Sequence, residues 1–406
     1  MAPTISARGK TDLDAALAAA IADPLLPAQF WGVTTAKGPI YFNCGGERVL
    51  HEPERGEVTE DTVLQLWSMT KLVTSVACLQ LVDRGEVSLD DEGVIAAHLP
   101  ELAAQRILTG HTEAGAEVWA ERTKPLTLRH LLSHTSGVPY PEMPPAIARW
   151  QTEHDHPWYF APGAGIEALA VPLEFEPGAG WSYGLGIDWA GVLVARVSGS
   201  TLGDYFSEHI FGPLGITSLT FVPAPGVLAR LMKETWRDAE GGLVQANPDT
   251  RPLDAAALKT HAGGAGLLGT AKDYLRFLEG ILASATPGGI LSPASFALLF
   301  KNTLPADRGA RHYADMEAFM GSWGTYDFNA ELGFSVALAT NAKDAASGRK
   351  AGSGAWGGMA KTEFWIDPAS GIAGFCGTQL VGGEVNPDPF AAVYAGFESC
   401  VYAALE

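Results

Sequence analysis

Segments typical of β-strands lie near the two ends of this chain, and mostly helical segments lie between them. Residues 30–38 and 39–46 are short runs rich in aromatic and β-branched residues, so they predict a hairpin that turns at a Lys-Gly pair. Strand-like runs return at 332–340 and on both sides of a turn at 367–371. Strands from both termini can form one sheet if the middle of the chain is an insertion.

Helical patterns occupy that middle and also flank the strand-like ends. Apolar residues recur at helical spacing in the segments 12–23, 126–134, 187–199, 202–215 and 389–406. These patterns predict an α/β domain with one sheet and a second domain that is mainly helical.

The expected domain boundaries follow from the same pattern. Residues 1–90 and 262–406 are expected to form the α/β domain, and residues 91–261 the helical domain. A cleft between two such domains is the usual place for a small-molecule site.

The composition excludes two classes of partner. The 406 residues carry a net charge of −19, with 47% hydrophobic and 18% charged residues. Nucleic acids and anionic membranes both require clustered Lys and Arg, so neither is an expected partner. No apolar run approaches the ~20 residues of a membrane span, and the N-terminal segment has no secretory signal pattern. We expect a cytoplasmic protein.

The four cysteines are consistent with that compartment. Cys44, Cys78, Cys376 and Cys400 are scattered, with no CxxC pair and no histidine at metal-ligand spacing. They predict free, mostly buried thiols rather than a disulfide framework. No metal and no organic cofactor is expected, and the sequence carries no signal for an oligomeric state.

Residues 180–184 read Gly-Trp-Ser-Tyr-Gly, the pattern around the nucleophilic serine of many hydrolases. A nucleophile elbow needs a buried strand before it, whereas 175–179 read Phe-Glu-Pro-Gly-Ala, which is turn chemistry. The glycine run at 261–266 resembles an oxyanion loop but follows the pentapeptide, against the α/β-hydrolase order. We interpret Ser182 as a loop residue beside a more important neighbour.

A second serine, Ser68, stands three residues before Lys71. Apolar residues at helical spacing follow in 72–85, so both side chains should share one face of a helix. First-turn N–H groups lack intrahelical partners, which would let the Ser68 N–H hold an oxyanion. An N-capping serine with a solvated lysine is an equally good interpretation of these residues alone.

A lysine activates a serine only when it is neutral, and an ordinary lysine pKa of about 10.4 keeps it charged at pH 7. Burial lowers a lysine pKa because it disfavours the charged form. Trp67, Met69 and Leu72 flank the pair and predict a dry setting.

Further segments follow in an order that resembles the serine β-lactamase, penicillin-binding protein and family VIII carboxylesterase group. After Ser-x-x-Lys come LTLRHLLSHTSGVPY, PGAGWSYGLGIDWAG, GGAGLLGTAKDYLRFL and GAWGGMAKTEFWIDP, at 126–140, 177–191, 263–278 and 354–368. The resemblance spans about residues 10–400 and is closest to the esterase and lovastatin-type acyltransferase branch. It implies a β-lactamase/transpeptidase-like fold, with an antiparallel sheet flanked by helices and a mainly helical inserted domain.

The resemblance also implies a Ser-Lys-Tyr catalytic set, with Tyr183 beside Ser68 and Lys71. A tyrosine with its ordinary pKa of about 10 is a poor base unless a cation favours the phenolate. Lys71 could supply that charge. The two would take the Ser68 proton together, and Tyr183 would return it to the leaving alcohol. The coupled titration leaves open which of them holds the proton at rest.

Two departures from the lactamase pattern favour an esterase. Residues 183–185 read Tyr-Gly-Leu where a class C β-lactamase has Tyr-x-Asn, and 356–358 read Trp-Gly-Gly where it has Lys-Thr-Gly. The missing Asn and Lys would bind the amide and carboxylate of a β-lactam.

The branch also implies which residues meet the substrate. The Met359 N–H would be the second oxyanion donor, with that of Ser68. The expected substrate-binding residues are Trp356, Gly357, Gly358, Leu185 and Trp181. The two glycines would let a substrate carbonyl approach the strand backbone.

Other patterns carry weaker signals. His134 suggests a Ser-His-Asp triad, but a loop-bracing role is favoured because the resemblance supplies a Ser-Lys-Tyr set. Residues 264–269 match a dinucleotide fingerprint without the strand it needs. Residues 361–363 look like a displaced Lys-Thr-Gly and more simply begin a strand. The polar run 154–156 predicts an exposed loop rather than a metal site.

We therefore expect a serine esterase or acyltransferase that acts through a Ser68 acyl-enzyme. Its partners would be small-molecule esters or thioesters, either small hydrophobic esters or carriers of a secondary-metabolite acyl group. Water, an alcohol or an amine would resolve the acyl-enzyme. The alternatives are a dedicated acyltransferase, a β-lactam hydrolase and a non-catalytic binding relative.

Overall fold

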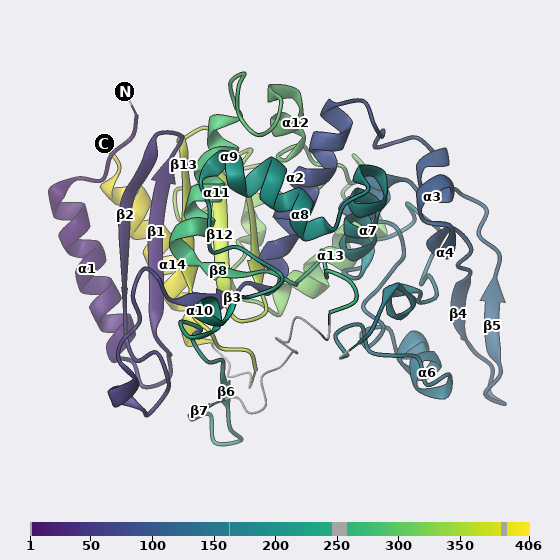
Figure 1. The fold of residues 1–406 in the computed structure, drawn as a ribbon, viewed down its shortest axis with the longest axis horizontal. Coiled ribbons are helices and arrows are strands. Elements are labelled where there is room, and N and C mark those ends of the chain that lie inside the picture. The colour runs from purple at the N-terminus through teal and green to yellow at the C-terminus, as the bar shows by residue number, and fades with distance from the viewer. Residues whose placement is uncertain (1, 162, 246–257, 383–387) are drawn as a thin grey trace.

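The two ends of the chain form one antiparallel sheet in the computed structural model, which describes residues 2–161, 163–245, 258–382 and 388–406 (Figure 1). The seven strands run in the order β2-β1-β13-β12-β11-β10-β9. N-terminal and C-terminal strands pair directly, through β1 and β13. The prediction of one sheet built from both termini is confirmed. The strands are β1 (Gln29–Thr35), β2 (Gly38–Gly45), β9 (Leu332–Phe334), β10 (Ala339–Asn341), β11 (Gly354–Gly358), β12 (Thr362–Asp367) and β13 (Ile372–Gly377).

The predicted hairpin is present, and the two strand-like runs around the turn at 367–371 form a second one. β1 pairs with β2, and β12 pairs with β13. Asp367 closes the second hairpin, because its carboxylate accepts from the N–H of Ser370 at 2.9 Å and from its hydroxyl at 2.8 Å. This is the local hydrogen bonding that favours Asp at turns.

Helices cover both faces of the sheet. α1 (Ala7–Ala22) and α14 (Pro389–Ala404) pack together on one face, where Trp31 of β1 belongs to their apolar cluster. α11 (Ala271–Ala283) packs on the other face of β1. Side chains of a strand alternate between faces, so β1 is buried on both sides.

The remaining elements lie between and beside these layers. The helices are α2 (Thr70–Asp83), α3 (Gly93–His98), α4 (Pro100–Ala103), α5 (Leu128–Leu132), α6 (Pro145–Glu153), α7 (Gly186–Ser198), α8 (Leu202–Phe206), α9 (Gly212–Leu214), α10 (Pro225–Leu228), α12 (Pro293–Leu298) and α13 (Arg311–Gly321). Three two-stranded pairs are β3 (Val63–Gln65) with β8 (Leu268–Thr270), β4 (Ile107–His111) with β5 (Glu117–Ala120), and β6 (Thr235–Arg237) with β7 (Leu243–Gln245).

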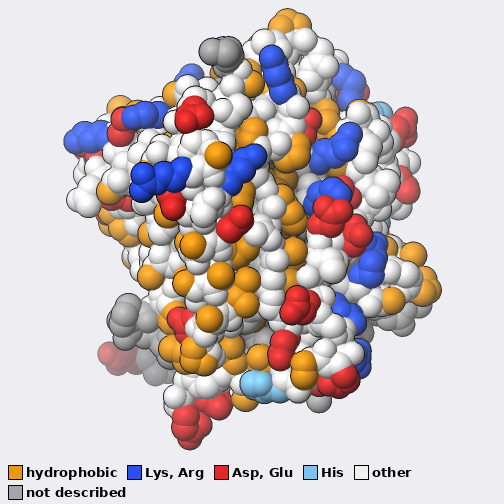
Figure 2. Space-filling model, turned by 90° about the vertical axis from the view of Figure 1, so that its left-hand side faces the viewer, with side chains coloured by type: hydrophobic (Ala, Val, Ile, Leu, Met, Phe, Trp, Pro, Cys, Tyr) orange, Lys and Arg blue, Asp and Glu red, His pale blue; other side chains and the backbone are white. Residues whose placement is uncertain are grey.

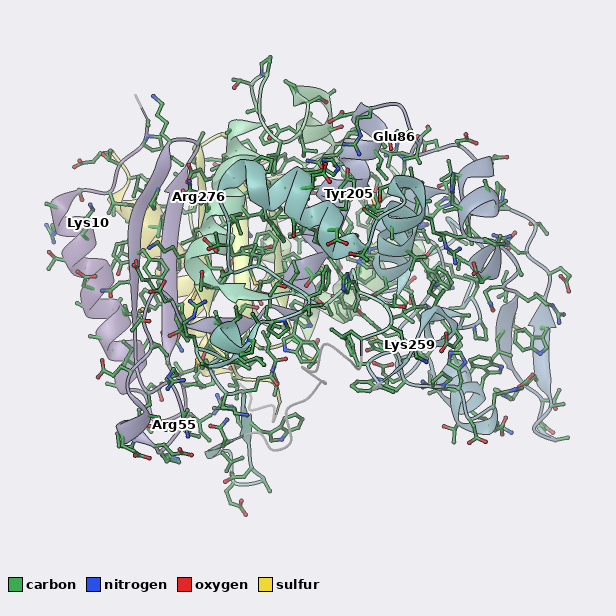
Figure 3. The ribbon with its side chains drawn as sticks, in the orientation of Figure 1. Lys10, Arg55, Glu86, Tyr205, Lys259 and Arg276 are labelled. Carbon is green, nitrogen blue, oxygen red and sulfur yellow. The ribbon has the colours of Figure 1, made fainter. Side chains whose placement is uncertain are left out.

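α2 is the central helix of the molecule. All of its residues from Thr70 to Leu81 are buried, and it packs against α7, α8 and α12. Just beyond its C-terminus, Arg84 donates to the hydroxyl of Tyr205 and to the carboxylate of Glu86, at 2.6 Å each; Figure 3 labels both partners. The helix is therefore held along its length by side-chain packing and at its end by polar contacts.

Part of the expected helical domain, around residues 220–232, packs against residues of the expected α/β domain. Thr220 forms a bridge with Leu268, and the Met232 N–H donates to the Val63 carbonyl at 2.9 Å. Residues 246–257 of the same expected domain lie outside the described residues. The division at 90/91 and 261/262 stays a prediction.

Charges of both signs are interspersed on the face shown in Figure 2, which is the side carrying α1 and β2. In the parts of the chain that the structure describes, no helix combines the length and apolarity that crossing a membrane requires.

Candidate active site

Ser68 lies in a single 3₁₀ turn, Trp67–Met69, that leads directly into α2. Trp67 has a φ of 48°, which is uncommon for a bulky residue. Its indole N–H donates to Glu234 Oε1 at 2.7 Å, which helps to hold this conformation. Ser68 is 8% exposed, so the serine at the head of the helix is buried and fixed.

Lys71 follows one turn later, and three acceptors enclose its Nζ. Nζ donates to Ser68 Oγ at 3.1 Å, to the Tyr140 hydroxyl at 2.9 Å and to the Gly264 carbonyl at 2.8 Å. These acceptors match the three N–H groups of an ammonium. A neutral amine would still donate to Gly264 and would accept a proton from a hydroxyl.

Tyr183 reaches Ser68 from another side. Its hydroxyl donates to Ser68 Oγ at 2.5 Å, and its ring centroid lies 4.5 Å from Lys71 Nζ. The Tyr140 N–H donates to the Tyr183 carbonyl at 3.2 Å, which holds the two tyrosines side by side. The structure therefore brings Ser68, Lys71 and Tyr183 together around one oxygen.

Burial moves the pKa values of this set apart. It lowers the pKa of Lys71 to about 7, although the carboxylate of Asp188 opposes the shift. Burial raises the pKa of Tyr183, against the hydrogen bond to Ser68, and raises that of Tyr140 well above 10. Near pH 7 the two tyrosines are neutral phenols, and Lys71 is the group that most readily takes up or releases a proton.

Asp188 positions the carbonyl that accepts from Lys71. Its Oδ1 accepts from the Gly264 N–H at 2.9 Å. A Cβ on Gly264 would lie 2.3 Å from Asp188 Oδ2, so this approach requires glycine. The Gly263 carbonyl accepts from the Thr74 hydroxyl at 2.6 Å, which ties the same turn to α2. Within the glycine pattern at 264–269, Gly264 thus serves the lysine site.

A cavity of about 550 Å³ opens above Ser68. Its walls combine loops of the expected helical domain, the end of α13 and the C-terminal end of β11, so the cavity lies between the sheet and those loops. Its lining is mainly aromatic and aliphatic. Besides Ser68 and Tyr183, the lining includes Trp67, Tyr140, Glu142, Met143, Trp158, Tyr159, Phe160, Ala265, Phe319, Ser322, Trp323, Thr325, Gly358, Met359, Lys361, Glu363, Leu380, Val381, Gly382 and Phe390.

Of the expected substrate-binding residues, Gly358 lines this cavity, whereas Trp356, Trp181, Leu185 and Gly357 do not. Trp356 and Trp181 are 1% and 3% exposed. Their ring centroids lie 5.4 Å and 6.3 Å from that of Tyr183. Both tryptophans therefore pack against the ring of Tyr183 instead of lining the cavity.

The space over Gly357 is filled by protein. A Cβ there would lie 2.4 Å from a carboxylate oxygen of Glu363, which is its partner across β11 and β12. A Cβ on Gly358 would lie 2.4 Å from the Leu66 carbonyl, next to the serine turn. The two glycines thus admit Glu363 and the chain that carries Ser68, where the sequence led us to expect a substrate carbonyl.

Met359 directly follows β11 and lines the cavity together with Ser68. Its side chain is among the exposed large apolar groups, at 48%. The two residues are thus on the same cavity, as an oxyanion pair requires. Their N–H groups as oxyanion donors stay a prediction.

Ser182 and His134 have other surroundings. Ser182 lies in the irregular segment before α7, does not line the cavity, and donates its N–H to the His134 carbonyl at 2.9 Å. The His134 ring is buried among the rings of Trp181, Tyr183, Phe334 and Trp356. Neither of its nitrogens has a hydrogen-bond partner in the described residues, and burial lowers its pKa. It packs the loop rather than forming a triad.

The two remaining patterns also have local explanations. Lys361 immediately precedes β12, pairs with Asp388 and lines the cavity. In the run 154–156, His154 Nε2 pairs with Glu117 Oε1 at 2.7 Å, and His156 Nε2 lies 3.2 Å from a backbone carbonyl.

Four residues of the site were missed by the sequence analysis. Tyr140 and Gly264 contact Lys71, Asp188 holds Gly264, and Glu363 lines the cavity. Tyr140 ends one of the segments that resemble the family, and Asp188 stands five residues after Tyr183. Glu363 had a readable signal, namely a carboxylate in an apolar strand. Burial raises its pKa to about 8.

Residues 13–393 match the model of the family described as Beta-lactamase. The chain belongs to the beta-lactamase family. It is 34% identical over 363 residues to a lovastatin esterase of Penicillium rubens, covering 86% of this chain and 87% of the relative. It is 31% identical over 374 residues to a monacolin J acid methylbutanoyltransferase of Aspergillus terreus, covering 89% and 88%.

Solved structures agree with these relatives. A mutant simvastatin synthase of Aspergillus terreus superposes with a TM-score of 0.86 at 31% identity, covering 98% of this chain and 95% of that one. A family VIII carboxylesterase, at a TM-score of 0.69 and 17% identity over the full length of both chains, shares the fold. The predicted fold and enzyme class are confirmed. The protein is a serine hydrolase or acyltransferase with a β-lactamase-like fold.

Proposed function

We propose that this protein is a serine esterase with acyltransferase capacity, in which Ser68 carries the acyl group. One observation supports this most strongly: Ser68 Oγ lies 3.1 Å from Lys71 Nζ and 2.5 Å from the Tyr183 hydroxyl, beneath an apolar cavity. A base and an acid are thus both within hydrogen-bond reach of the nucleophile.

In acylation, neutral Lys71 takes the proton of the Ser68 hydroxyl while Oγ attacks the substrate carbonyl carbon. The Ser68 and Met359 N–H groups hold the developing oxyanion. When the tetrahedral intermediate collapses, the carbon–oxygen bond to the leaving alcohol breaks and Tyr183 protonates that alcohol. Lys71 is then an ammonium and Tyr183 a phenolate, which stabilise each other across the 4.5 Å between Nζ and the ring.

Deacylation reverses these roles. The Tyr183 phenolate takes a proton from water or an acceptor alcohol, whose oxygen attacks the acyl carbon. The bond from that carbon to Ser68 Oγ breaks, and the Lys71 ammonium returns its proton to Oγ. Each cycle leaves both groups in their starting states, so hydrolysis and transfer differ only in the nucleophile that enters.

We propose small hydrophobic esters or thioesters, including carriers of a secondary-metabolite acyl group, as acyl donors. A cavity of about 550 Å³ lies within the size range of drug-sized ligand sites, and its lining favours apolar groups. The similarity to proteins named lovastatin esterase and monacolin J acid methylbutanoyltransferase supports this class. The free thiols of all four cysteines support a cytoplasmic setting.

Acyl transfer to an alcohol or amine is the second candidate, because the described relatives include an esterase and a transferase at similar identity. β-Lactam hydrolysis is not favoured, since 183–185 lack the Asn and 356–358 lack the Lys of the lactamase pattern.

An acyl-donor screen tests the proposal. Short p-nitrophenyl esters and acyl thioesters are supplied with and without a hydrophobic alcohol, and acid and transfer product are both quantified. We expect turnover and an acyl adduct on the peptide that contains Ser68. An active enzyme whose adduct lies elsewhere, or comparable turnover of a chromogenic cephalosporin, would overturn the proposal.

A further inference from the structure

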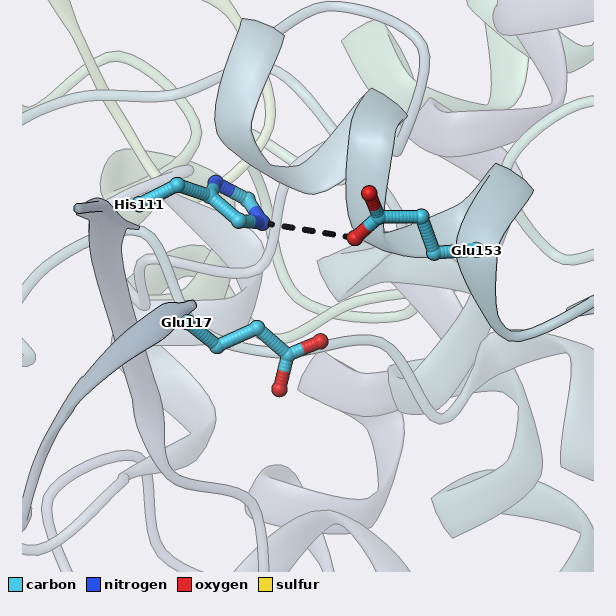
Figure 4. A group of neighbouring side chains, drawn as sticks. All are labelled: His111, Glu117 and Glu153. Atoms are coloured by element: carbon cyan, nitrogen blue, oxygen red, sulfur yellow. Dashed lines mark ion pairs between the residues drawn. The ribbon is translucent and has the colours of Figure 1, made fainter. Parts of the chain in front are cut away.

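A second cluster of titratable side chains lies in the helical part, away from the catalytic cavity. His111 ends β4, Glu117 begins β5 and Glu153 ends α6, and none of them lines the cavity above Ser68. One donor atom of each residue lies within 4.8 Å of the other two (Figure 4). One imidazole and two carboxylates therefore point toward a common space.

The imidazole of His111 is the unexplained member of this cluster. The His111 side chain is 8% exposed, and Nε2 is buried without a hydrogen-bond partner in the described residues. Glu153 Oε2 faces Nε2 from 3.8 Å, which is too far for a hydrogen bond. A buried polar nitrogen without a hydrogen-bond partner costs free energy, and binding of this nitrogen to a metal ion would remove that cost.

Groups outside the cluster orient its carboxylates. Arg149 Nε donates to Glu153 Oε1 at 2.7 Å, so the second oxygen faces the cluster. Glu117 accepts from His154 Nε2 at 2.7 Å and from Trp119 Nε1 at 2.9 Å. Outer hydrogen bonds of this kind orient the ligands of metal sites.

We propose that His111, Glu117 and Glu153 bind one divalent transition-metal ion, with Zn²⁺ as the best match. An imidazole nitrogen with two carboxylates suits Zn²⁺, whereas Mg²⁺ and Ca²⁺ prefer all-oxygen sites. Two carboxylates also neutralise the charge of the ion. The ligand bonds of about 2.1 Å require the donors to close together. The Glu117 and Glu153 side chains, which are 23% and 43% exposed, have room to do so.

Such an ion would join the β4–β5 hairpin to α6. α6 lies in sequence between two groups of cavity-lining residues, Glu142 with Met143 and Trp158 to Phe160. The ion thus restrains the helix that connects these two groups of cavity-lining residues, and it takes no part in the chemistry at Ser68.

Calorimetric titration of the metal-free protein with zinc chloride tests this site. We expect one ion per chain, with the affinity reduced at least about tenfold in His111→Gln and in Glu153→Gln. His156→Gln is the matched control, because His156 lies near the same helix end but outside the cluster. It should retain wild-type affinity within about twofold, and magnesium chloride should give no comparable heat.

A cobalt(II) spectrum adds a readout that is independent of stability. Four-coordinate Co²⁺ gives intense visible bands, which should appear in the wild type and His156→Gln and be lost in His111→Gln. Glu153→Gln changes an exposed side chain, so it keeps the test valid if His111→Gln does not fold. Absence of stoichiometric binding, or equal binding by His111→Gln and His156→Gln, would refute the site. In that case His111 pairs with Glu153 as an ordinary ion pair.

Discussion

The floor and the walls of the catalytic cavity are built on opposite principles. The floor consists of Ser68, Lys71, Tyr140, Tyr183 and Gly264, which are joined by buried hydrogen bonds of 2.5 to 3.1 Å. The walls are largely apolar, and several of their side chains are about half exposed, including Trp158 and Met359 at 43% and 48%. From this difference we infer that the floor carries out the acyl chemistry and that the walls select the substrate.

The largest expected effect tests whether the floor alone carries the chemistry. Ser68→Ala removes the atom that forms the acyl bond, so we expect kcat/KM to fall by at least about 10⁴-fold. Ser182→Ala is the matched control, since Ser182 belongs to the other serine pattern and does not line the cavity. Ester turnover and fluorophosphonate labelling measure both. Comparable losses of turnover in the two variants would contradict the assignment of Ser68, and not Ser182, as the nucleophile.

Lys71→Met tests the proton acceptor of the floor. Methionine keeps the apolar stem without the amine, so we expect acylation to slow by about 10³-fold, within the range of general-base effects. The pKa of Lys71 is lowered to about 7, and only its neutral form accepts a proton. Acylation by the wild type should therefore rise with pH through about 7 and level off above it. Single-turnover rates from pH 5.5 to 9 measure this limb, which Lys71→Met should lack.

The two tyrosines on the floor have different partners, so their variants distinguish the proposed general acid, Tyr183, from the residue that positions Lys71, Tyr140. Tyr183→Phe removes the group beside Ser68 Oγ, so we expect kcat to fall about 10²-fold. Tyr140→Phe removes only an acceptor for Lys71 Nζ. It should cost about tenfold and move the acidic limb to lower pH, because a lost acceptor disfavours the ammonium. Equal losses with unshifted profiles would contradict these roles.

Contacts of the floor between residues close in the sequence could be predicted, whereas contacts between distant residues could not. Ser68 and Lys71 are three residues apart, so their spacing predicts a shared helix face, and the family resemblance decided between a reactive pair and an N-cap with a solvated lysine. The Lys71 contacts to Tyr140 and Gly264 join residues 69 and 193 positions apart, and no local pattern encodes them. Tyr183 could be named only because its segment resembles a family.

The walls were harder to predict because strand residues can face either the cavity or the core. Trp356 was expected to meet the substrate, yet it is 1% exposed behind Tyr183. Gly357 was expected to admit a substrate carbonyl, yet the carboxyl group of Glu363 fills the space above it. Which side chain occupies the space over a glycine depends on the neighbouring strand, and a single sequence does not specify that pairing in advance.

The smallest expected effect concerns the buried carboxyl group of the wall. Burial raises the pKa of Glu363 to about 8, far above its value in an unfolded chain, which is about 4.3. Between these values the folded state binds more protons than the unfolded state, so this group makes stability fall as pH rises from about 4.3 to 8. Glu363→Gln removes the titration. Its free energy of unfolding, relative to the wild type, should therefore increase over that range, while kcat/KM for a neutral ester at pH 6 changes less than about threefold. Urea unfolding at several pH values measures the first quantity. A parallel pH dependence in both proteins would mean that Glu363 keeps an ordinary pKa in the folded state and is ionised in the wall at neutral pH.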